Sequence, residues 1–465
     1  MGKPEISLAD RFDLTKSPVL LNGTQALVRL MLMQKARDRA AGLNTAGYVT
    51  GYRGSPLGGV DLNMAKSRSL LEAGDIRFQP GLNEDLAATA VWGSQQAELR
   101  GEGRFDGVFA LWYGKGPGVD RSGDVMRHAN MAGTSPHGGV LMAMGDDHTG
   151  ESSTVLHQSD WAMVDAYIPV LSPAGVQEIL DYGLYGWALS RFAGVWVGLK
   201  TMKDTVEATA VVDGDPFRLA FVAPEYRMPP GGLNIRLQDT PVAQEARMID
   251  HKRFAAEAFS QANRMDRRVW GRPGAKIGFV AAGKNWLDLV HALSLLGIDE
   301  AEAERLGLTT YKIGQTFPLD MKGFHDWAEG LDLIVVVEEK RKLIEVQIKE
   351  AIFDDRRGRR VYGWYKGGAG GMHREELFPT RYALDPAWIA GKLGEILIEE
   401  GRGTDGIRAG LERVREARKA DNALEIAARL PYYCSGCPHN TSTKVPEGSR
   451  AVAGIGCHYM AQWMD

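Results

Sequence analysis

The feature that most constrains the fold is an alternation of short apolar segments and longer amphipathic segments between residues 17 and 225. This rhythm is typical of βαβ units, in which helices cover a mostly parallel sheet. Segments 22–41 and 84–100 carry apolar residues at spacings of three and four, as amphipathic helices do. We therefore predict a doubly wound α/β domain. Its strand candidates are residues 46–50, 107–112, 138–144, 168–170 and 195–199.

Glycine-rich loops follow the first three predicted strands, with the sequences GYRGSPLGG, YGKGPG and GDDHTG. The chain holds 56 glycines, about 12% of its residues, against a usual share of about 7%. In open parallel sheets, ligands bind beyond the carboxyl ends of the strands. We therefore expect these three loops to converge on one site.

A second α/β domain is predicted after a proline- and glycine-rich break over 224–243 and a polar helix that reaches about Met265. The segment RRVWGRPGAK completes the linker. The predicted elements beyond it are a strand over 276–283, a helix over 286–296, a strand over 332–338, a helix over 341–352, a mobile loop over 354–375 and helices over 387–430.

Composition excludes several classes of protein. A length of 465 residues predicts two to four domains at roughly 100–200 residues each. The 55 basic and 59 acidic residues give a net charge of -4, so no basic field points to nucleic acid as a partner. The chain has no apolar stretch of ~18 residues and no apolar signal core at its start, so we expect a cytoplasmic protein without a membrane partner.

The three cysteines, Cys434, Cys437 and Cys457, all lie in the last 32 residues. This distribution favours a local metal or redox site over a disulfide framework. A CxxC sequence places two thiolates on one tight turn, which suits zinc, a redox dithiol or an iron–sulfur cluster. For an isolated CxxC, zinc ranks first.

Three short segments at the predicted strand ends carry the candidate chemistry: 54–56, 83–84 and 115–118. Glu84 follows a Gly81-Leu82-Asn83 turn at the start of a predicted helix, where the helix dipole stabilises a carboxylate. Taken alone, Glu84 reads as a capping charge and KGPG as an ordinary turn. The functional interpretation gains weight because all three segments fall at strand ends of one sheet.

The order GYRGSPLGG, LNEDLAATAVWGSQQ, LWYGKGPGVDRSGD and MGDDHTGESS resembles the pyrimidine-binding domain of thiamine diphosphate dependent 2-oxoacid:ferredoxin oxidoreductases. Within that family the sequence is most similar to the indolepyruvate branch, in particular its large fused bacterial form. The segments KIGFVAAGKNW, YKIGQTFPLD and LDLIVVVEEKRKLIEVQIKE resemble the transketolase C-terminal-like domain that follows. The resemblance runs from about residue 12 to the end of the chain.

The resemblance implies thiamine diphosphate with Mg²⁺, and the oxidative decarboxylation of an aryl 2-oxoacid such as indolepyruvate. Glu84 would be the catalytic carboxylate against the aminopyrimidine. The implied cofactor-binding residues are Gly54, Ser55, Pro56, Asn83, Lys115, Gly116 and Gly118, and the implied substrate-binding residues are Lys115, Asp120 and Arg127. A further family pattern matches Asp146, Asp147, Ser152 and Ser153. Asp120 departs from the asparagine expected in relatives, which leaves the substrate open.

The resemblance also implies that Cys434, Cys437 and Cys457 bind a [4Fe-4S] cluster, with a fourth ligand outside this chain. Coenzyme A would receive the acyl group and ferredoxin the electrons. We expect residues 1–465 to be the N-terminal portion of a roughly two-fold larger enzyme. The chain would then need the rest of the enzyme or a partner subunit for activity, and we expect it to form a homo-oligomer.

The implied domains are a pyrimidine-binding domain over 1–225, a linker with a helix over 226–270, a transketolase C-terminal-like domain over 271–400, a connecting helix over 401–430 and the incomplete start of a diphosphate-binding domain over 431–465. Two other classes stay open. One is a non-catalytic scaffold or regulatory subunit with structural zinc. The other is a nucleotide-binding coenzyme A ligase using Gly283, although no G-x-G-x-x-G follows that strand.

Several residues are weaker candidates for function, and a structural role is the simpler interpretation of each. His128, His137, His148 and His157 are interpreted as surface or internally satisfied histidines. The basic run 356–360 would suit phosphates of coenzyme A or the acidic face of ferredoxin. A solvated loop is the simpler interpretation of that run.

Overall fold

The computed structural model describes residues 7–151, 153, 155–367, 375–421, 430–454 and 456–464. The chain divides into two compact units, residues 1–411 and 412–465. Ser152 and part of the helix predicted over 387–430 lie outside the described residues. The first unit contains two largely parallel sheets with helices on their faces, so the predicted multi-domain α/β class is confirmed.

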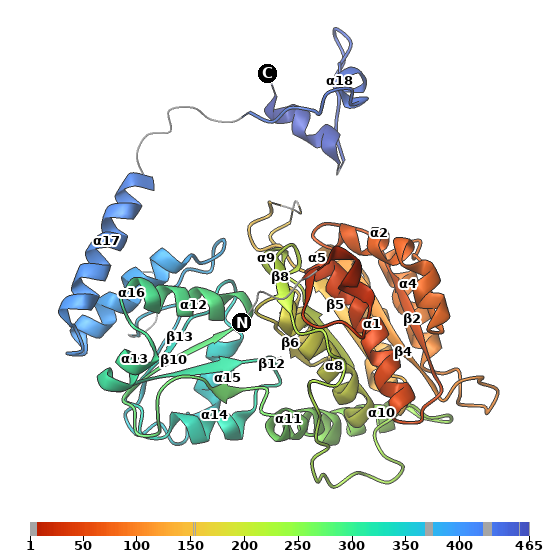
Figure 1. The fold of residues 1–465 in the computed structure, drawn as a ribbon, viewed down its shortest axis with the longest axis horizontal. Helices are drawn as coiled ribbons and strands as arrows, with labels where there is room; N and C mark the ends of the chain where they lie inside the picture. The colour runs from red at the N-terminus through yellow and green to blue at the C-terminus, as the bar shows by residue number, and fades with distance from the viewer. Residues whose placement is uncertain are drawn as a thin grey trace. The chain divides into compact units, whose positions relative to one another are not determined.

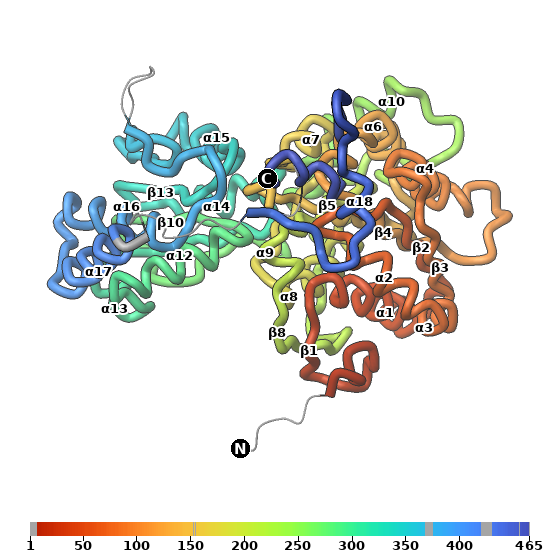
Figure 2. Tube along the Cα trace, turned by 90° about the horizontal axis from the view of Figure 1, so that it is seen from above, coloured from red at the N-terminus to blue at the C-terminus, as the bar shows by residue number. Residues whose placement is uncertain are grey.

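The first sheet has seven strands in the order β12-β6-β7-β5-β4-β2-β3. Figure 1 labels β12, β6, β5, β4 and β2 of this sheet, and Figure 2 labels β5, β4, β2 and β3. All neighbours are parallel except β12, which joins from the second half of the unit and pairs antiparallel with β6. All five predicted strands are present. The bounds are β2 (Thr45–Gly51), β3 (Ile76–Phe78), β4 (Gly107–Lys115), β5 (Val140–Gly145), β6 (Val170–Leu171), β7 (Trp196–Lys200) and β12 (Gln315–Phe317).

Strand β4 shows why the apolar runs are continuous. Phe109 and Leu111 face one core, whereas Ala110 and Trp112 face the other, and all four are fully buried. A strand buried on both faces carries apolar side chains on both, so its sequence is a nearly continuous apolar run. The first core is covered by α1 (Gly23–Ala40), α2 (Gly58–Lys66), α3 (Arg68–Ala73) and α8 (Val176–Ala193). The second is covered by α4 (Glu84–Ser94), α5 (Gly116–Arg121), α6 (Gly123–Ala132) and α7 (Asp160–Asp165).

Arg29 on α1 fastens the start of the chain to the core. Its side chain is fully buried, and the guanidinium donates to the backbone carbonyls of Arg11 (2.8 Å), Lys16 (3.0 Å) and Gly214 (2.8 Å). The same region contains η1 (Leu8–Phe12) and the antiparallel pair β1 (Val19–Asn22) and β8 (Thr209–Val212). One buried cation thus satisfies carbonyls from segments almost 200 residues apart.

We expect Arg29→Met to lower the free energy of unfolding by about 3 kcal/mol or more, because it leaves several buried carbonyls without donors. Urea denaturation of the purified variant measures this loss. Arg39→Met is the matched control, since Arg39 lies on the same helix, is 57% exposed and forms only a surface ion pair with Asp75. The control should stay within about 0.5 kcal/mol of the wild type. Equal stability of both variants would contradict the role of Arg29.

The second sheet has the strand order β14-β13-β10-β11-β9, with β9 antiparallel. The strands predicted over 276–283 and 332–338 are present as β10 (Ile277–Ala282) and β13 (Leu333–Val336). The further strands are β9 (Arg267–Arg268), β11 (Leu308–Ile313) and β14 (Arg360–Tyr362). The helices are α12 (Gly283–Leu295), α13 (Glu300–Leu306), α14 (Met321–Ala328), α15 (Ile344–Ala351), α16 (Pro386–Glu399) and α17 (Asp405–Asp421).

The prediction of a mobile loop over 354–375 is wrong for residues 360–362, which form β14 and pair with β13. Arg359 precedes this short strand and Arg360 is its first residue, so its sequence lacks the apolar signal of a buried strand. Residues 368–374 lie outside the described residues.

Between the sheets, the chain runs through α9 (Lys203–Val206), α10 (Pro241–Arg247), the π-helical turn η2 (Met248–Lys252) and α11 (Arg253–Ala262). Lys252 is fully buried and donates to the carbonyls of Asn130 (3.1 Å) and Gly194 (2.8 Å). Burial lowers the pKa of Lys252 to about 7. The lysine therefore anchors the linker to the ends of α6 and α8.

The second unit contains α18 (His439–Ser442) and η3 (Cys457–Trp463). In the part of the chain that the structure describes, no helix combines the length and the apolar character needed to cross a bilayer.

Candidate functional site

The strand order of the first sheet identifies where a ligand would bind. From β2 the chain moves to β3 on one side and then to β4 on the other. Such a switch in direction opens a crevice beyond the carboxyl ends of the two strands, where open α/β sheets bind ligands. The loops after β2 and β4 meet at this place, because the backbone of Gly54 lies against the side chain of Lys115. The end of β5 joins them, because a Cβ at Gly145 would lie 3.1 Å from Cδ of Pro56, so the predicted convergence of the three loops is observed.

Glu84 is the first residue of α4, placed there by its neighbour Asn83. The Asn83 side chain caps the helix by accepting the backbone N–H of Leu86 at 2.9 Å. The indole N–H of Trp112, on β4, donates to the backbone carbonyl of Glu84 at 3.0 Å. Glu84 is only 7% exposed, and the described residues offer its carboxylate no hydrogen-bond partner. A buried acceptor in this state is suited to a donor from a ligand.

The glycines of the loop after β4 make room for Glu84. A Cβ at Gly118 would lie 2.5 Å from Cγ of Glu84 and 2.8 Å from its Oε1. Only glycine therefore fits at 118, and α5 approaches the carboxylate with bare backbone. Arg121 on α5 also pairs with Asp85 at 2.9 Å. A cavity of about 320 Å³ lies beside these loops, lined among others by Gly51, Tyr52, Arg53 and Gly81.

The opposite side of α5 rests on His157. A Cβ at Gly116 would lie 2.2 Å from the imidazole, and Nε2 of His157 donates to Asp120 at 2.8 Å. Nδ1 points to the buried Asp146 at 3.4 Å, whose carboxylate also accepts from the hydroxyl of Ser159 at 2.6 Å. Burial opposes a charge on His157, but the two carboxylates outweigh it and raise the pKa of the imidazole. The imidazole of His157 therefore lies between two carboxylates, those of Asp120 and Asp146.

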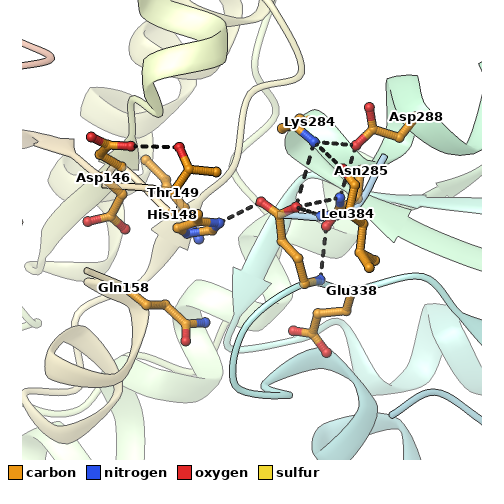
Figure 3. Close-up of polar contacts among 12 residues, drawn as sticks. Asp146, His148, Thr149, Gln158, Lys284, Asn285, Asp288, Glu338 and Leu384 are labelled. Atoms are coloured by element: carbon orange, nitrogen blue, oxygen red, sulfur yellow. Dashed lines mark hydrogen bonds and ion pairs between the residues drawn. The ribbon is translucent and has the colours of Figure 1, made fainter. Parts of the chain in front are cut away.

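A second buried cluster joins the two sheets of the unit (Figure 3). Nδ1 of His148, after β5, lies 2.5 Å from Oε1 of Glu339, after β13. Oε2 of Glu339 accepts from the backbone of Leu384 at 2.9 Å and lies 3.6 Å from Nζ of Lys284. Burial would raise the pKa of Glu339, but His148 and Lys284 hold it well below its usual range. Asn285 completes the cluster with an amide donor at 3.2 Å.

This cluster bears on the nucleotide-binding alternative. Gly283 lies at the carboxyl end of β10, but a Cβ there would stand 2.3 Å from Oγ of Ser172 in the first half of the unit. The remaining cavity measures only about 40 Å³, far below the roughly 300–1,000 Å³ of usual ligand pockets. The crevice that a nucleotide would need is therefore filled by the protein itself.

Arg127 and the arginines of the basic run are engaged in contacts within the protein. Arg127, predicted to bind substrate, forms an ion pair with Asp165 and donates to its backbone carbonyl. In the basic run, Arg360 pairs with Glu400 at 2.6 Å, and Arg359 is buried and donates to the carbonyl of Leu331. The arginines of this run are thus largely engaged within the protein.

The cysteine-rich segment belongs to the second unit. Cys434 and Cys457 are exposed and Cys437 is half-buried. The backbone N–H of Cys437 donates to the carbonyl of Cys434 at 3.0 Å, and Sγ of Cys437 lies 3.2 Å from Nδ1 of His439. Within the described ranges, no three His, Cys, Asp or Glu side chains are placed to hold a metal ion. The predicted three-cysteine metal site is therefore not assembled in this structure.

Comparison with known proteins agrees with the fold. A solved 2-oxoglutarate:ferredoxin oxidoreductase from Magnetococcus marinus superposes with a TM-score of 0.55 at 14% identity, over 82% of this chain and 65% of that one. The unit thus has the multi-domain α/β fold of the 2-oxoacid oxidoreductase class.

More specifically, residues 267–421 match the family model described as the indolepyruvate oxidoreductase domain. The chain is 25% identical to indolepyruvate oxidoreductase subunit IorA of Pyrococcus abyssi, over 95% of this chain and 61% of that protein. It is 22% identical to subunit IorA of Methanothermobacter marburgensis, over 88% and 59%. The resemblance to the indolepyruvate branch is confirmed, and these relatives are IorA subunits. The chain spans about 60% of the length of these relatives.

Proposed function

We propose that this chain provides the pyrimidine-binding and transketolase C-terminal-like portions of a thiamine diphosphate dependent 2-oxoacid oxidoreductase. The observation that carries the proposal is the unpartnered, buried carboxylate of Glu84 beneath a glycine loop at the switch point of the first sheet. When bound, thiamine diphosphate supplies a nucleophilic carbon and an electron sink for the decarboxylation of a 2-oxoacid.

The protein's part is to place and ionise the cofactor. Glu84 would share a proton with N1′ of the aminopyrimidine, while Gly116 and Gly118 let the backbone approach it. Residues 54–56 and Asn83 would shape the remaining walls. Lys115 would provide a positive charge toward the substrate carboxylate, next to Asp120, which pairs with His157.

The rest of the cofactor site would come from outside these residues. Leu82 and Leu86 flank Glu84 and are 85% and 51% exposed. Apolar surface of this kind next to a buried carboxylate favours a covering partner. We infer that a diphosphate-binding domain, from more chain or another subunit, covers this surface and brings Mg²⁺ with it.

We further propose an aryl 2-oxoacid as substrate, coenzyme A as acyl acceptor, ferredoxin as electron acceptor and a homo-oligomeric enzyme in the cytoplasm. The support is the similarity to indolepyruvate oxidoreductase subunits. Cys434, Cys437 and Cys457 are proposed ligands of a [4Fe-4S] cluster whose fourth ligand lies elsewhere. Because the described residues do not gather the three cysteines, no step of the reaction is assigned to them.

The test compares residues 1–465 with the complete enzyme, both purified without oxygen. We expect the complete enzyme to contain iron, sulfide and thiamine, and to reduce a viologen dye with indolepyruvate and coenzyme A. The chain alone should not reduce the dye. Zinc in both preparations, with no dye reduction by any 2-oxoacid, would overturn the proposal and favour a scaffold or regulatory subunit.

A further inference from the structure

A cavity of about 590 Å³ lies between the loop after β5 and the loop after β13. Residues 155–158 and 161–162 form one wall and residues 340–341 form part of the other. Gln158 joins the walls, because its side chain accepts the backbone N–H of Arg341 at 3.1 Å and donates to the carbonyl of Arg341 at 3.2 Å. The two walls are therefore held in fixed register.

Lys340 lines this cavity and is not explained by the fold. It is only 7% exposed, yet the described residues give its ammonium group neither a hydrogen bond nor an ion pair. Burial lowers the pKa of Lys340, whereas the carboxylates of Glu339 and Asp147 act in the opposite direction, so the ammonium group carries a cost of partial desolvation. Its backbone adds a second cost, since φ is +59° in the left-handed region that favours glycine. A glycine here would avoid both costs.

The other charged side chains that line the cavity already have partners within the protein. Asp120, on the rim, pairs with His157, which is held from behind by Asp146. The guanidinium of Arg341 lies over the ring of Trp161 at 5.6 Å. Lys340 is therefore the cation of this cavity that lacks a partner among the described residues.

Apolar surface lies in the same cavity. Val155 and Leu156 line it and are 41% and 47% exposed. A ligand with both a charged group and an apolar body would cover these side chains while pairing with the ammonium group.

We propose that this cavity binds a small organic carboxylate, whose charged group pairs with Lys340 and whose apolar body covers Val155 and Leu156. One unpartnered ammonium group beside the carboxylate of Asp120 favours a single negative charge over a phosphate dianion. Aryl 2-oxoacids belong to this class of ligand. The identity of the natural ligand as that substrate rests on the proposed function, but the binding itself does not.

The test is isothermal titration of residues 1–465 with indole-3-acetate, an aromatic carboxylate that lacks the ketone and so cannot react. We expect binding to the wild type and a loss of about tenfold or more in affinity in Lys340→Gly, since a charge-assisted contact is removed. Glycine adopts the left-handed backbone without cost. The melting temperature of Lys340→Gly should therefore equal or exceed that of the wild type.

Lys322→Met is the matched control, because Lys322 is a 70% exposed lysine on α14 and does not line the cavity. Its affinity for indole-3-acetate should equal that of the wild type. Absence of binding, or equal binding by Lys340→Gly, would overturn the inference. Competition by inorganic phosphate at comparable concentration would overturn the assignment to carboxylates.

These outcomes separate the inference from the proposed function. Binding of indole-3-acetate without dye reduction by the complete enzyme would sink the proposed function alone. Dye reduction with the same KM for indolepyruvate in wild type and Lys340→Gly would leave the reaction standing and contradict the role of the cavity in substrate binding.

Discussion

Glu84→Gln is expected to lower the turnover of the 2-oxoacid by the complete enzyme by about 10²–10⁴-fold, the usual contribution of a positioned acid–base group. The amide has the same shape as the carboxylate but cannot exchange a proton with N1′ of the aminopyrimidine. Viologen reduction by indolepyruvate and coenzyme A measures the loss. Thiamine content, measured on the same preparation, shows whether the variant still binds the cofactor.

The structure predicts that this variant folds normally. The carboxylate of Glu84 has no hydrogen-bond partner among the described residues. The substitution therefore removes only the favourable interaction of its negative charge with the N-terminal end of α4, which is worth about 0.3–1 kcal/mol. Asp85→Asn is the matched control, because Asp85 is the next residue of the helix and pairs with Arg121 at the surface. Asp85→Asn should keep near wild-type turnover, and equal activity of Glu84→Gln would remove Glu84 from the mechanism.

The position of Glu84 was predictable because two strong local signals coincide. Continuous apolar strands identify the parallel sheet, and glycine loops mark the carboxyl ends where ligands bind. The helix predicted over 84–100 starts at Glu84 as expected but ends at Ser94. The side chain of Gln95 ends the helix, since it accepts the backbone N–H groups of Ser135 (3.2 Å) and Gly139 (2.9 Å). A single sequence does not reveal such distant partners.

Other parts of the structure leave no local trace in the sequence. The sequence predicts an ordinary histidine at position 157. In the structure, the fold brings the carboxylates of Asp120 and Asp146 to its two ring nitrogens. The left-handed backbone of Lys340 is likewise invisible in a charged run of residues. Signals of this kind arise from long-range contacts. The one clue available was position, because Asp146 and Lys340 both follow predicted strands at their carboxyl ends.

The pairing of His148 with Glu339 spans 191 residues and supports the largest stability prediction. Glu339→Gln should lower the free energy of unfolding by about 3–5 kcal/mol at neutral pH, because it removes the carboxylate from a buried cluster and leaves Lys284 and His148 without their shared partner. Chemical denaturation measures this change. Glu329→Gln, an exposed glutamate 3.7 Å from Arg357, should change stability by no more than about 0.5 kcal/mol.

The pH dependence of the same variant gives a second, signed test. Because the folded protein holds the pKa of Glu339 well below its usual range, the unfolded chain binds a proton at this residue first as pH falls. The stabilisation is therefore complete above the unfolded pKa of about 4.3 and is lost progressively below it. The difference in stability between wild type and Glu339→Gln should shrink as the pH falls from 6 toward 3. A difference that stays constant over that range would show that Glu339 stabilises the unit by its shape and not by its charge.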